Sequence, residues 1–250
     1  MSGEALVVGR RPALEAVRAG AAAEVLVAHT ARPTEGLREL LDAAAAAGVP
    51  VRRVPEEVVA RAAGGTRHQG VAARVAPRRE LTEADLEHGP WGGRALVLVL
   101  DGVTDPQNLG AAARVAEAAG AEALVIRRHR GAGVTPAAVK ASAGALMHLP
   151  VARVANIARA VGRLQQAGFW VVGLEGDAPG TIHELSPPPG RLAVVMGSEG
   201  AGLSRLVARA CDELASIPMR GRVGSLNVAA AAAVGLFVLE SRRHPPSRGS

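Results

Sequence analysis

The sequence predicts an α/β protein that consists of a small N-terminal domain and a larger domain with a parallel sheet. Short apolar runs alternate with helical patterns along the 250 residues, which is typical of parallel strands covered by helices. The runs 96–100 and 192–196 are almost wholly apolar, as strands buried on both faces are. Residues 77–93 are rich in proline, glycine and acids, and they predict a linker with one short helix.

The first domain is predicted to span residues 1–76 as a compact α/β unit. Pro12 is favourable in the first turn of a helix, and Gly48 is a typical helix end. Loops rich in glycine and polar residues separate the other elements. In chain order we expect a helix at 11–19, a strand at 24–28, a helix at 34–47, a strand at 49–54, a helix at 55–63 and a strand at 70–75.

The second domain is predicted to span residues 94–241, and the tail 242–250 is predicted to be disordered. Its apolar runs have the length of strands, and the segments between them show helical periodicity. The expected strands are 95–100, 123–126, 149–151, 170–174, 192–196 and 213–217, and the expected helices are 109–118, 136–142, 156–167, 204–210 and 226–241.

Composition limits the class of protein. The longest nearly unbroken apolar run, 228–239, is too short and too rich in alanine and glycine to span a membrane comfortably. No secretory signal is visible at the N-terminus. The single cysteine, Cys211, excludes an internal disulfide and a cysteine-rich zinc site. We therefore expect a protein of the cytoplasm, and because the seven histidines show no ligand spacing we assign no metal.

The formal net charge of +6 is compatible with a polyanionic partner. The compatibility is weak evidence, because a GC-rich coding sequence also favours arginine, and Lys140 is the one lysine. Tyrosine is absent and aromatic residues make up 2% of the chain. Base stacking on an aromatic platform is therefore not expected.

Three segments, 101–114, 194–204 and 217–227, each pass from an apolar strand into a polar, glycine-rich loop. Loops at the carboxyl ends of parallel strands are where α/β enzymes bind ligands. The glycines of the second segment permit close approach of the backbone to a ligand, or simply a tight turn. Their spacing does not match a dinucleotide fingerprint, which disfavours a nicotinamide dehydrogenase.

Together the three segments resemble the three motifs of the SpoU/TrmH class of SPOUT RNA 2′-O-methyltransferases, over about residues 94–240. The resemblance implies a deep trefoil knot that binds S-adenosylmethionine, with backbone groups reading the adenine. It also implies that Glu199 faces the methyl-transfer region. The cofactor site implied in this way is lined by Leu174, Glu175, Gly197, Ile217 and Leu226.

The resemblance also indicates the catalytic residues. Its arginine corresponds to Arg114, which is often assigned the role of base in this class. Because a guanidinium stays protonated in proteins, we favour Arg114 as a phosphate anchor and a stabiliser of the developing alkoxide, and leave the proton acceptor open. Asn108, Ser225 and Asn227 are expected to shape the site together with Glu199, and helix capping is an alternative role for these three.

Two N-terminal segments, 8–17 and 66–73, resemble the opening and the end of the ribosomal-protein-like (L30e/L7Ae-type) substrate domain of bacterial 23S rRNA guanosine 2′-O-methyltransferases. This implies RNA contacts by Arg67, His68 and Gln69, although His68 alone fits a polar turn equally well. The implied substrate is a guanosine in the peptidyl-transferase region of 23S rRNA. The alternatives are a tRNA 2′-O-methyltransferase, a resistance enzyme acting elsewhere on 23S rRNA, and a non-catalytic RNA-binding assembly factor.

The class resemblance further implies a homodimer that completes the site across a two-fold axis, with the apolar final helix as the interface. Cys211 is expected to be a buried small side chain and not a nucleophile, because no histidine lies near it in the sequence.

Overall fold

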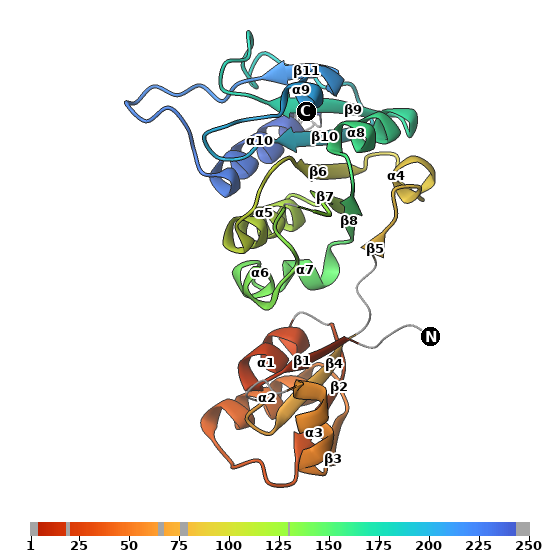
Figure 1. Cartoon of the computed structure of the whole chain (residues 1–250), viewed down its shortest axis with the longest axis vertical. Helices are drawn as coiled ribbons and strands as arrows, with labels where there is room; N and C mark the ends of the chain where they lie inside the picture. Colours follow the sequence, from red (N-terminus) through yellow and green to blue (C-terminus); the bar gives the residue numbers. More distant parts are fainter. Residues whose placement is uncertain (1–4, 19–20, 65–67, 76–79, 130, 244–250) are drawn as a thin grey trace, which may run out of the picture. The chain divides into compact units, whose positions relative to one another are not determined.

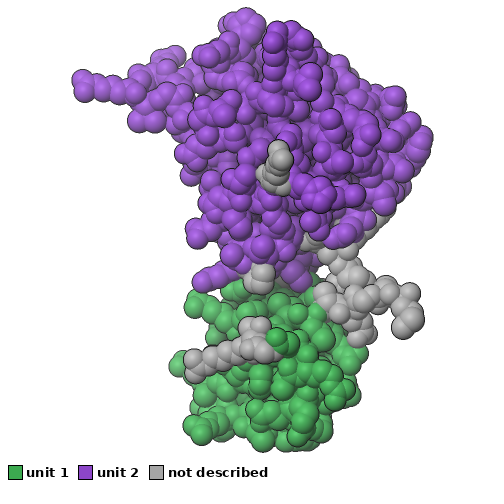
Figure 2. Space-filling model, in the orientation of Figure 1, with its two compact units in different colours: residues 1–78 green, residues 79–250 purple. Residues whose placement is uncertain are grey.

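The computed structural model describes residues 5–18, 21–64, 68–75, 80–129 and 131–243. The chain divides into two compact units, residues 1–78 and 79–250, which are coloured separately in Figure 2. Both units are α/β, which confirms the predicted fold class.

The N-terminal unit is a mixed four-stranded sheet in the order β1-β4-β2-β3 (Figure 1). β4 runs antiparallel to both β1 and β2, whereas β3 is parallel to β2. The elements are β1 (Ala5–Val8), α1 (Arg10–Arg18), β2 (Ala22–Ala28), α2 (Glu35–Ala46), β3 (Val51–Val54), α3 (Glu56–Ala63) and β4 (Val71–Val75).

Successive residues of β2, from Val25 to Ala28, are buried, so both faces of this sheet are covered. Leu26 packs in one cluster with Val54, Val59 of α3 and Ala72, while α1 and α2 pack on each other. The sequence did not predict β1. It is four residues long and depends on pairing with β4, where Ala5 lies opposite Val75, and a contact between such distant segments leaves little local signal.

The C-terminal unit contains a seven-stranded sheet in the order β11-β9-β10-β6-β7-β8-β5, in which every neighbouring pair is parallel. Its elements are β5 (Glu80–Leu81), α4 (Asp85–His88), β6 (Leu96–Leu100), α5 (Pro106–Ala118), β7 (Ala123–Arg127), α6 (Pro136–Ala141), α7 (Ala145–His148), β8 (Val151–Val154), α8 (Ile157–Gln166), β9 (Phe169–Leu174), β10 (Arg191–Met196), α9 (Arg205–Ala210), β11 (Glu213–Ala215) and α10 (Val228–Arg243).

Each face of the large sheet packs on its own group of helices. The even residues of β6, such as Leu98, lie in the same cluster as Leu109 of α5 and Leu236 of α10. The odd residues, such as Val97, lie in a second cluster with Leu164 of α8 and Val207 of α9. Side chains of a strand point to the two faces of the sheet in turn. Because β6 is apolar at every position, it contributes to a core on each face, as a central strand does.

The segment 80–93 differs from the predicted linker, because it belongs to the second unit. β5 pairs with β8, where Leu81 lies opposite Ala152 and is buried. Leu86 of α4 is fully buried, and Glu83 accepts a hydrogen bond from the backbone N–H of Ala155 at 2.9 Å. A strand of two residues has no periodicity, so the pattern of prolines and glycines dominated the prediction.

The last helix also differs, because α10 continues to Arg243. The Arg243 side chain is 1% exposed, and its guanidinium donates hydrogen bonds to the backbone carbonyls of Ala95, Arg94 and Gly190. These bonds hold the helix end against the amino ends of β6 and β10. Of the tail predicted to be disordered, residues 244–250 lie outside the described residues.

The segments that follow β9 and β11 pair with each other. The Ile182 N–H donates to the carbonyl of Ser216 at 3.0 Å, and the Ser216 N–H donates to the carbonyl of Gly180 at 2.8 Å. These bonds lie in the region where the knot is expected. Passage of the chain through a loop there stays a prediction.

Candidate functional site

The parallel register brings the three motif segments to one edge of the sheet. Met196, at the end of β10, lies opposite Leu100 of β6 on one side and Leu174 of β9 on the other. Leu174 in turn lies opposite Ala215 of β11. The loops after these four strands therefore begin side by side, as the carboxyl ends of parallel strands do.

A pocket with a volume of about 280 Å³ opens among the loops that follow β9, β10 and β11, near the start of α10. Such a volume is close to the lower end of the range for small-molecule sites, roughly 300–1,000 Å³. All five residues predicted to bind the cofactor line it, together with Glu199 and Ser225 of the predicted catalytic set. The lining residues not predicted are Gly176, Asp177, Met196, Ser198, Gly200, Gly202, Met219, Gly224, Val228 and Ala231.

The wall after β10 is a tight backbone turn. Ser198 and Gly202 exchange two hydrogen bonds, with N···O distances of 3.1 and 3.0 Å. A Cβ on Gly197 would lie 2.0 Å from the carbonyl carbon of Gly202, so only glycine fits there. Glu175 accepts the backbone N–H of Leu203 at 2.8 Å, which ties the end of β9 to this turn.

Among the described residues, acids and no basic side chain line the pocket. Glu175, Asp177 and Glu199 are among its lining residues, which include neither lysine nor arginine. The chain as a whole carries a net charge of +6, so this lining is opposite in sign to the protein. Such a surface favours a cationic ligand and disfavours the phosphates of a dinucleotide.

Asp101 forms a buried clamp that the sequence did not indicate. Its carboxylate is 3% exposed and lies 3.0 Å from the guanidinium of Arg127 on β7. Its second oxygen accepts the backbone N–H of Ser204 at 2.9 Å, directly before α9. The clamp therefore joins the loop after β6 to the end of β7 and to the loop after β10. The sequence did contain a signal for this role, because Asp101 directly follows a strand that is apolar at every position.

Asn108 and Arg114 lie on α5, and neither lines the pocket. Arg114 is exposed, and its side chain makes no hydrogen bond within the part of the chain that the structure describes. Asp105 caps α5 by accepting the N–H of Gln107 at 3.0 Å, with Pro106 as the first helical residue. The alternative that Asn108 caps this helix is therefore wrong.

At the last helix the structure distinguishes Ser225 from Asn227. Asn227 accepts the backbone N–H of Ala230 at 2.8 Å and thus caps α10, so its capping role is confirmed. Ser225 is exposed and lines the pocket. In Figure 1 the segment between β11 and α10 leaves the body of the unit as a long loop.

Cys211 is partly buried, and its thiol donates to the backbone carbonyl of Val207 at 3.3 Å. Burial, with Asp212 and Asp101 nearby, raises the pKa of this thiol to about 12. The thiol is therefore protonated at neutral pH, in agreement with the expectation that it is no nucleophile.

The predicted RNA-binding residues lie in the N-terminal unit, where Arg67 falls outside the described residues. His68 accepts the N–H of Gly70 through Nδ1 at 3.1 Å, so its ring supports a turn. Arg10 donates to the carbonyl of Gln69 at 3.2 Å. An open groove gathers these groups, with its lining residues being Arg10, Thr30, Ala31, Arg32, Thr34, Glu56, Ala60, His68, Gln69 and Gly70.

The described residues also bear on metal binding and on membrane insertion. No group of three or more histidine, cysteine, aspartate or glutamate side chains there could hold a metal ion. No helix among them is long and apolar enough to cross a membrane.

Comparison with known proteins identifies the family. Residues 95–237 match the SpoU rRNA methylase family, and residues 6–81 match the RNA 2′-O ribose methyltransferase substrate-binding family. The chain belongs to the SpoU rRNA methylase family. The resemblance of the three motifs is thereby confirmed.

Relatives match across both units. A 23S rRNA (guanosine-2′-O-)-methyltransferase RlmB of Xylella fastidiosa is 47% identical over 76% of this chain and 77% of its own length. The RlmB of Salmonella typhi is 42% identical over 82% of this chain and 85% of its own. The crystal structure of the SpoU methyltransferase AviRb from Streptomyces viridochromogenes, in complex with AdoMet, superimposes with a TM-score of 0.70 at 28% identity and covers 97% of this chain and 91% of that one.

Proposed function

We propose that this SpoU methylase transfers a methyl group from S-adenosylmethionine to the ribose 2′-oxygen of a guanosine in 23S rRNA. The observation that carries the proposal is the pocket among the three motif loops, with acids and no basic side chain in its lining. S-adenosylmethionine carries a sulfonium and an ammonium against one carboxylate, so its net charge is opposite to that of this lining.

The chemistry of the lining also fits the rest of the cofactor. Met196, Ile217 and Val228 offer apolar contact for a planar base, and the turn at Gly197 brings backbone groups close to it. Glu175 is engaged with the N–H of Leu203, so we assign it to holding the wall and not to a direct contact with the cofactor. When bound, the cofactor supplies an electrophilic methyl group.

The chain's own residues would then position and activate the ribose hydroxyl. Glu199 lines the pocket, is exposed and makes no hydrogen bond in the described part of the chain, so its carboxylate is available to orient or accept the proton of that hydroxyl. Arg114 is assigned to an RNA phosphate and to the charge that develops on the oxygen. Asn108, Ser225 and Asn227 are assigned to shaping the site.

The choice of RNA rests on the N-terminal unit and on the relatives. The match over residues 6–81 is to a domain that binds the substrate of RNA 2′-O ribose methyltransferases, and the relatives that match across both units act on a guanosine of 23S rRNA. The groove with Arg10, Arg32, His68 and Gln69 is the surface we assign to RNA in this unit. A tRNA substrate is the main alternative.

We also propose a homodimer whose interface includes α10. Phe237 is a large apolar side chain that is 51% exposed on α10, and contact with a second copy would remove it from water. Arg114 lies outside the pocket of its own chain, and we propose that a second copy supplies the arginine for this site. Phe237→Glu should yield a monomer by sedimentation and lose activity, whereas a wild-type monomer at micromolar concentration would contradict the dimer.

Titration calorimetry with S-adenosylmethionine, followed by methyl transfer to transcripts of 23S rRNA and tRNA, tests the function. We expect binding of the cofactor, no binding of NAD, and transfer to the 23S transcript. Absence of cofactor binding would favour the non-catalytic assembly factor. Mapping of ribose methylation in a strain without this protein identifies the nucleotide, and loss of a tRNA mark with 23S rRNA unchanged would overturn the substrate assignment.

A further inference from the structure

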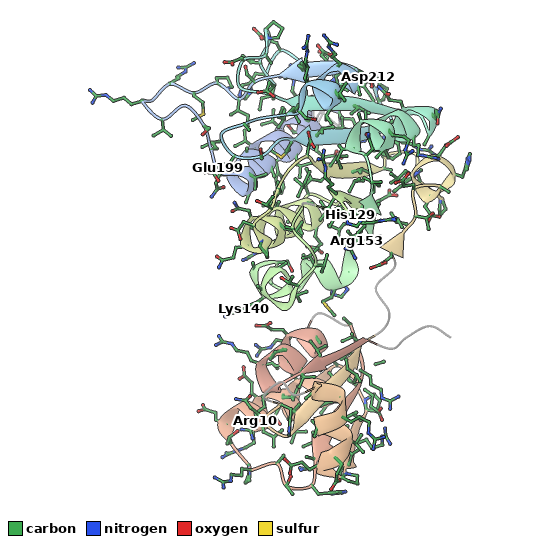
Figure 3. The ribbon with its side chains drawn as sticks, viewed as in Figure 1. Arg10, His129, Lys140, Arg153, Glu199 and Asp212 are labelled. Carbon is green, nitrogen blue, oxygen red and sulfur yellow. The ribbon has the colours of Figure 1, made fainter. Side chains whose placement is uncertain are left out.

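A second groove lies at the opposite side of the large sheet, where β5 pairs with β8. Its lining residues are Glu80, Leu81, Thr82, Glu83, Arg128, His129, Arg153, Ala155 and Arg159. Figure 3 labels His129 and Arg153, which lie beside β5 in that view. Neither the motifs nor the proposed site uses this groove.

The positive charge of this groove is only partly compensated. Glu83 is engaged by Arg159 at 3.0 Å and by the backbone N–H of Ala155 at 2.9 Å. Arg128 donates one hydrogen bond to the backbone carbonyl of Arg153 at 3.3 Å and acts on Glu83 only as one of three nearby arginines, and no ion pair within 4 Å joins it to an acid of the described residues. The Arg153 side chain is exposed and has neither a hydrogen bond nor an ion pair in the same set.

Arg153 lies on β8, which pairs with β7. The loop that carries Arg128 is bonded to the catalytic motif. It follows β7, whose last residue, Arg127, pairs with Asp101. The Ala132 N–H donates to the carbonyl of Val103 at 2.8 Å, in the loop that leads to α5. An ion pair and a backbone hydrogen bond therefore connect the loop of Arg128 to the first motif.

We infer that Arg128 and Arg153 bind the phosphate backbone of the RNA substrate on the side of the sheet away from the cofactor pocket. This rests on the proposed function. A guanidinium binds phosphate through a fork of N–H groups, and contacts to phosphate fix the register of a nucleic acid without reading its sequence. No phenylalanine, tyrosine or tryptophan of the described residues lines the groove, so we assign it to the backbone of the RNA and not to base stacking.

The test is a double variant, R128Q/R153Q, compared with R94Q in binding to a 23S rRNA transcript at several salt concentrations. Arg94 is an exposed arginine two residues before β6, at the amino end of this central strand. We expect R128Q/R153Q to raise the Kd by about tenfold and to lower the slope of log K against log salt by about 1.5, since each phosphate contact contributes roughly 0.7–0.9. R94Q and R128K/R153K should keep the wild-type slope.

Cofactor affinity and the melting temperature serve as folding controls, and both should be unchanged in the double variant. If the wild type is active and R128Q/R153Q keeps the wild-type Kd and salt slope, the inference is overturned. This includes the outcome in which the groove binds an acidic protein and not RNA, because the variant would then lose only the binding of that protein. A wild-type protein that binds the transcript but transfers no methyl group would overturn the proposed function and would leave the comparison of the variants readable.

Discussion

Two regions of the large sheet carry opposite charges. The loops after β9 and β10 contribute acids to a glycine-walled pocket that no lysine or arginine in the described part of the chain lines, whereas the β7–β8 side contributes arginines to an open groove. A methyltransferase must bind a cationic cofactor and a polyanionic RNA in the same unit. The difference teaches that charge can be separated along one sheet, so that each ligand is attracted to its own side.

The two regions also differ in how they are built. The pocket is shaped by backbone, since the turn at Gly197 leaves no room for a side chain and Glu175 holds that turn. The groove is shaped by long side chains on a strand and a loop. Substitutions should therefore break the pocket by altering its shape, and should weaken the groove gradually by altering its charge.

The largest effect is expected from Arg114→Ala. If Arg114 acts on phosphate and alkoxide and not on the cofactor, kcat should fall by about 100- to 1,000-fold while the affinity for S-adenosylmethionine changes by less than about twofold. Single-turnover methylation and calorimetry measure the two quantities, with Arg94→Ala as the control. If kcat and the affinity for S-adenosylmethionine fell equally, Arg114 would have to act on the cofactor and not on the RNA.

Gly197→Ala should break the pocket by shape alone. The new methyl group would lie 2.0 Å from the Gly202 backbone, so the turn must open, at a cost of about 3 kcal/mol in the free energy of unfolding. Cofactor binding should be lost as well. Gly176→Ala is the matched control, because this glycine also lines the pocket and nothing lies within 4 Å of the added Cβ. Wild-type cofactor affinity in Gly197→Ala would contradict the tight-turn interpretation.

Prediction from sequence was strongest where local pattern and chemistry agree. The apolar run of β10 followed by glycines predicted both a central strand and a ligand loop. Each predicted cofactor residue lies in the pocket, because a parallel sheet brings the loops after neighbouring strands together.

Prediction failed where a contact between distant segments decides the structure. β5 exists only through its pairing with β8, and the role of Asp101 depends on Arg127 and Ser204, 26 and 103 residues away. The alternative role of Asn108, as the cap of α5, was wrong for a different reason. Asp105 and Asn108 are both good capping residues, and the proline at position 106 was the signal that favours Asp105.

Asp101→Asn tests whether the two regions are mechanically joined. The substitution keeps the size of the side chain but leaves Arg127 without its carboxylate partner, and we expect a loss of about 2 kcal/mol in the free energy of unfolding. Because Asp101 also holds the N–H of Ser204, the affinity for the cofactor should fall together with the affinity for RNA. Asp105→Asn should be nearly neutral, since asparagine caps a helix as well as aspartate does.

The smallest effect concerns the anchoring of the groove. The backbone hydrogen bond from Ala155, opposed by burial and assisted by Arg159, Arg163 and Arg128, lowers the pKa of Glu83 below its ordinary value of 4.5. A lowered folded-state pKa stabilises the protein above the unfolded-state pKa, and this stabilisation is lost as the pH falls through the folded-state value.

Glu83→Gln should therefore cost about 1 kcal/mol at neutral pH, and the difference from wild type should shrink as the pH falls below about 4.5. Urea unfolding at a series of pH values measures it, with Glu117→Gln on the exposed face of α5 as the control. Since Glu83 fixes β5 beside Arg159, the same substitution should raise the positive charge of the groove and tighten RNA binding slightly at low salt. A destabilisation that is independent of pH would show that the carboxylate's charge does not hold β5 in place, and that the groove is anchored by the packing of Leu81 and Leu86 alone.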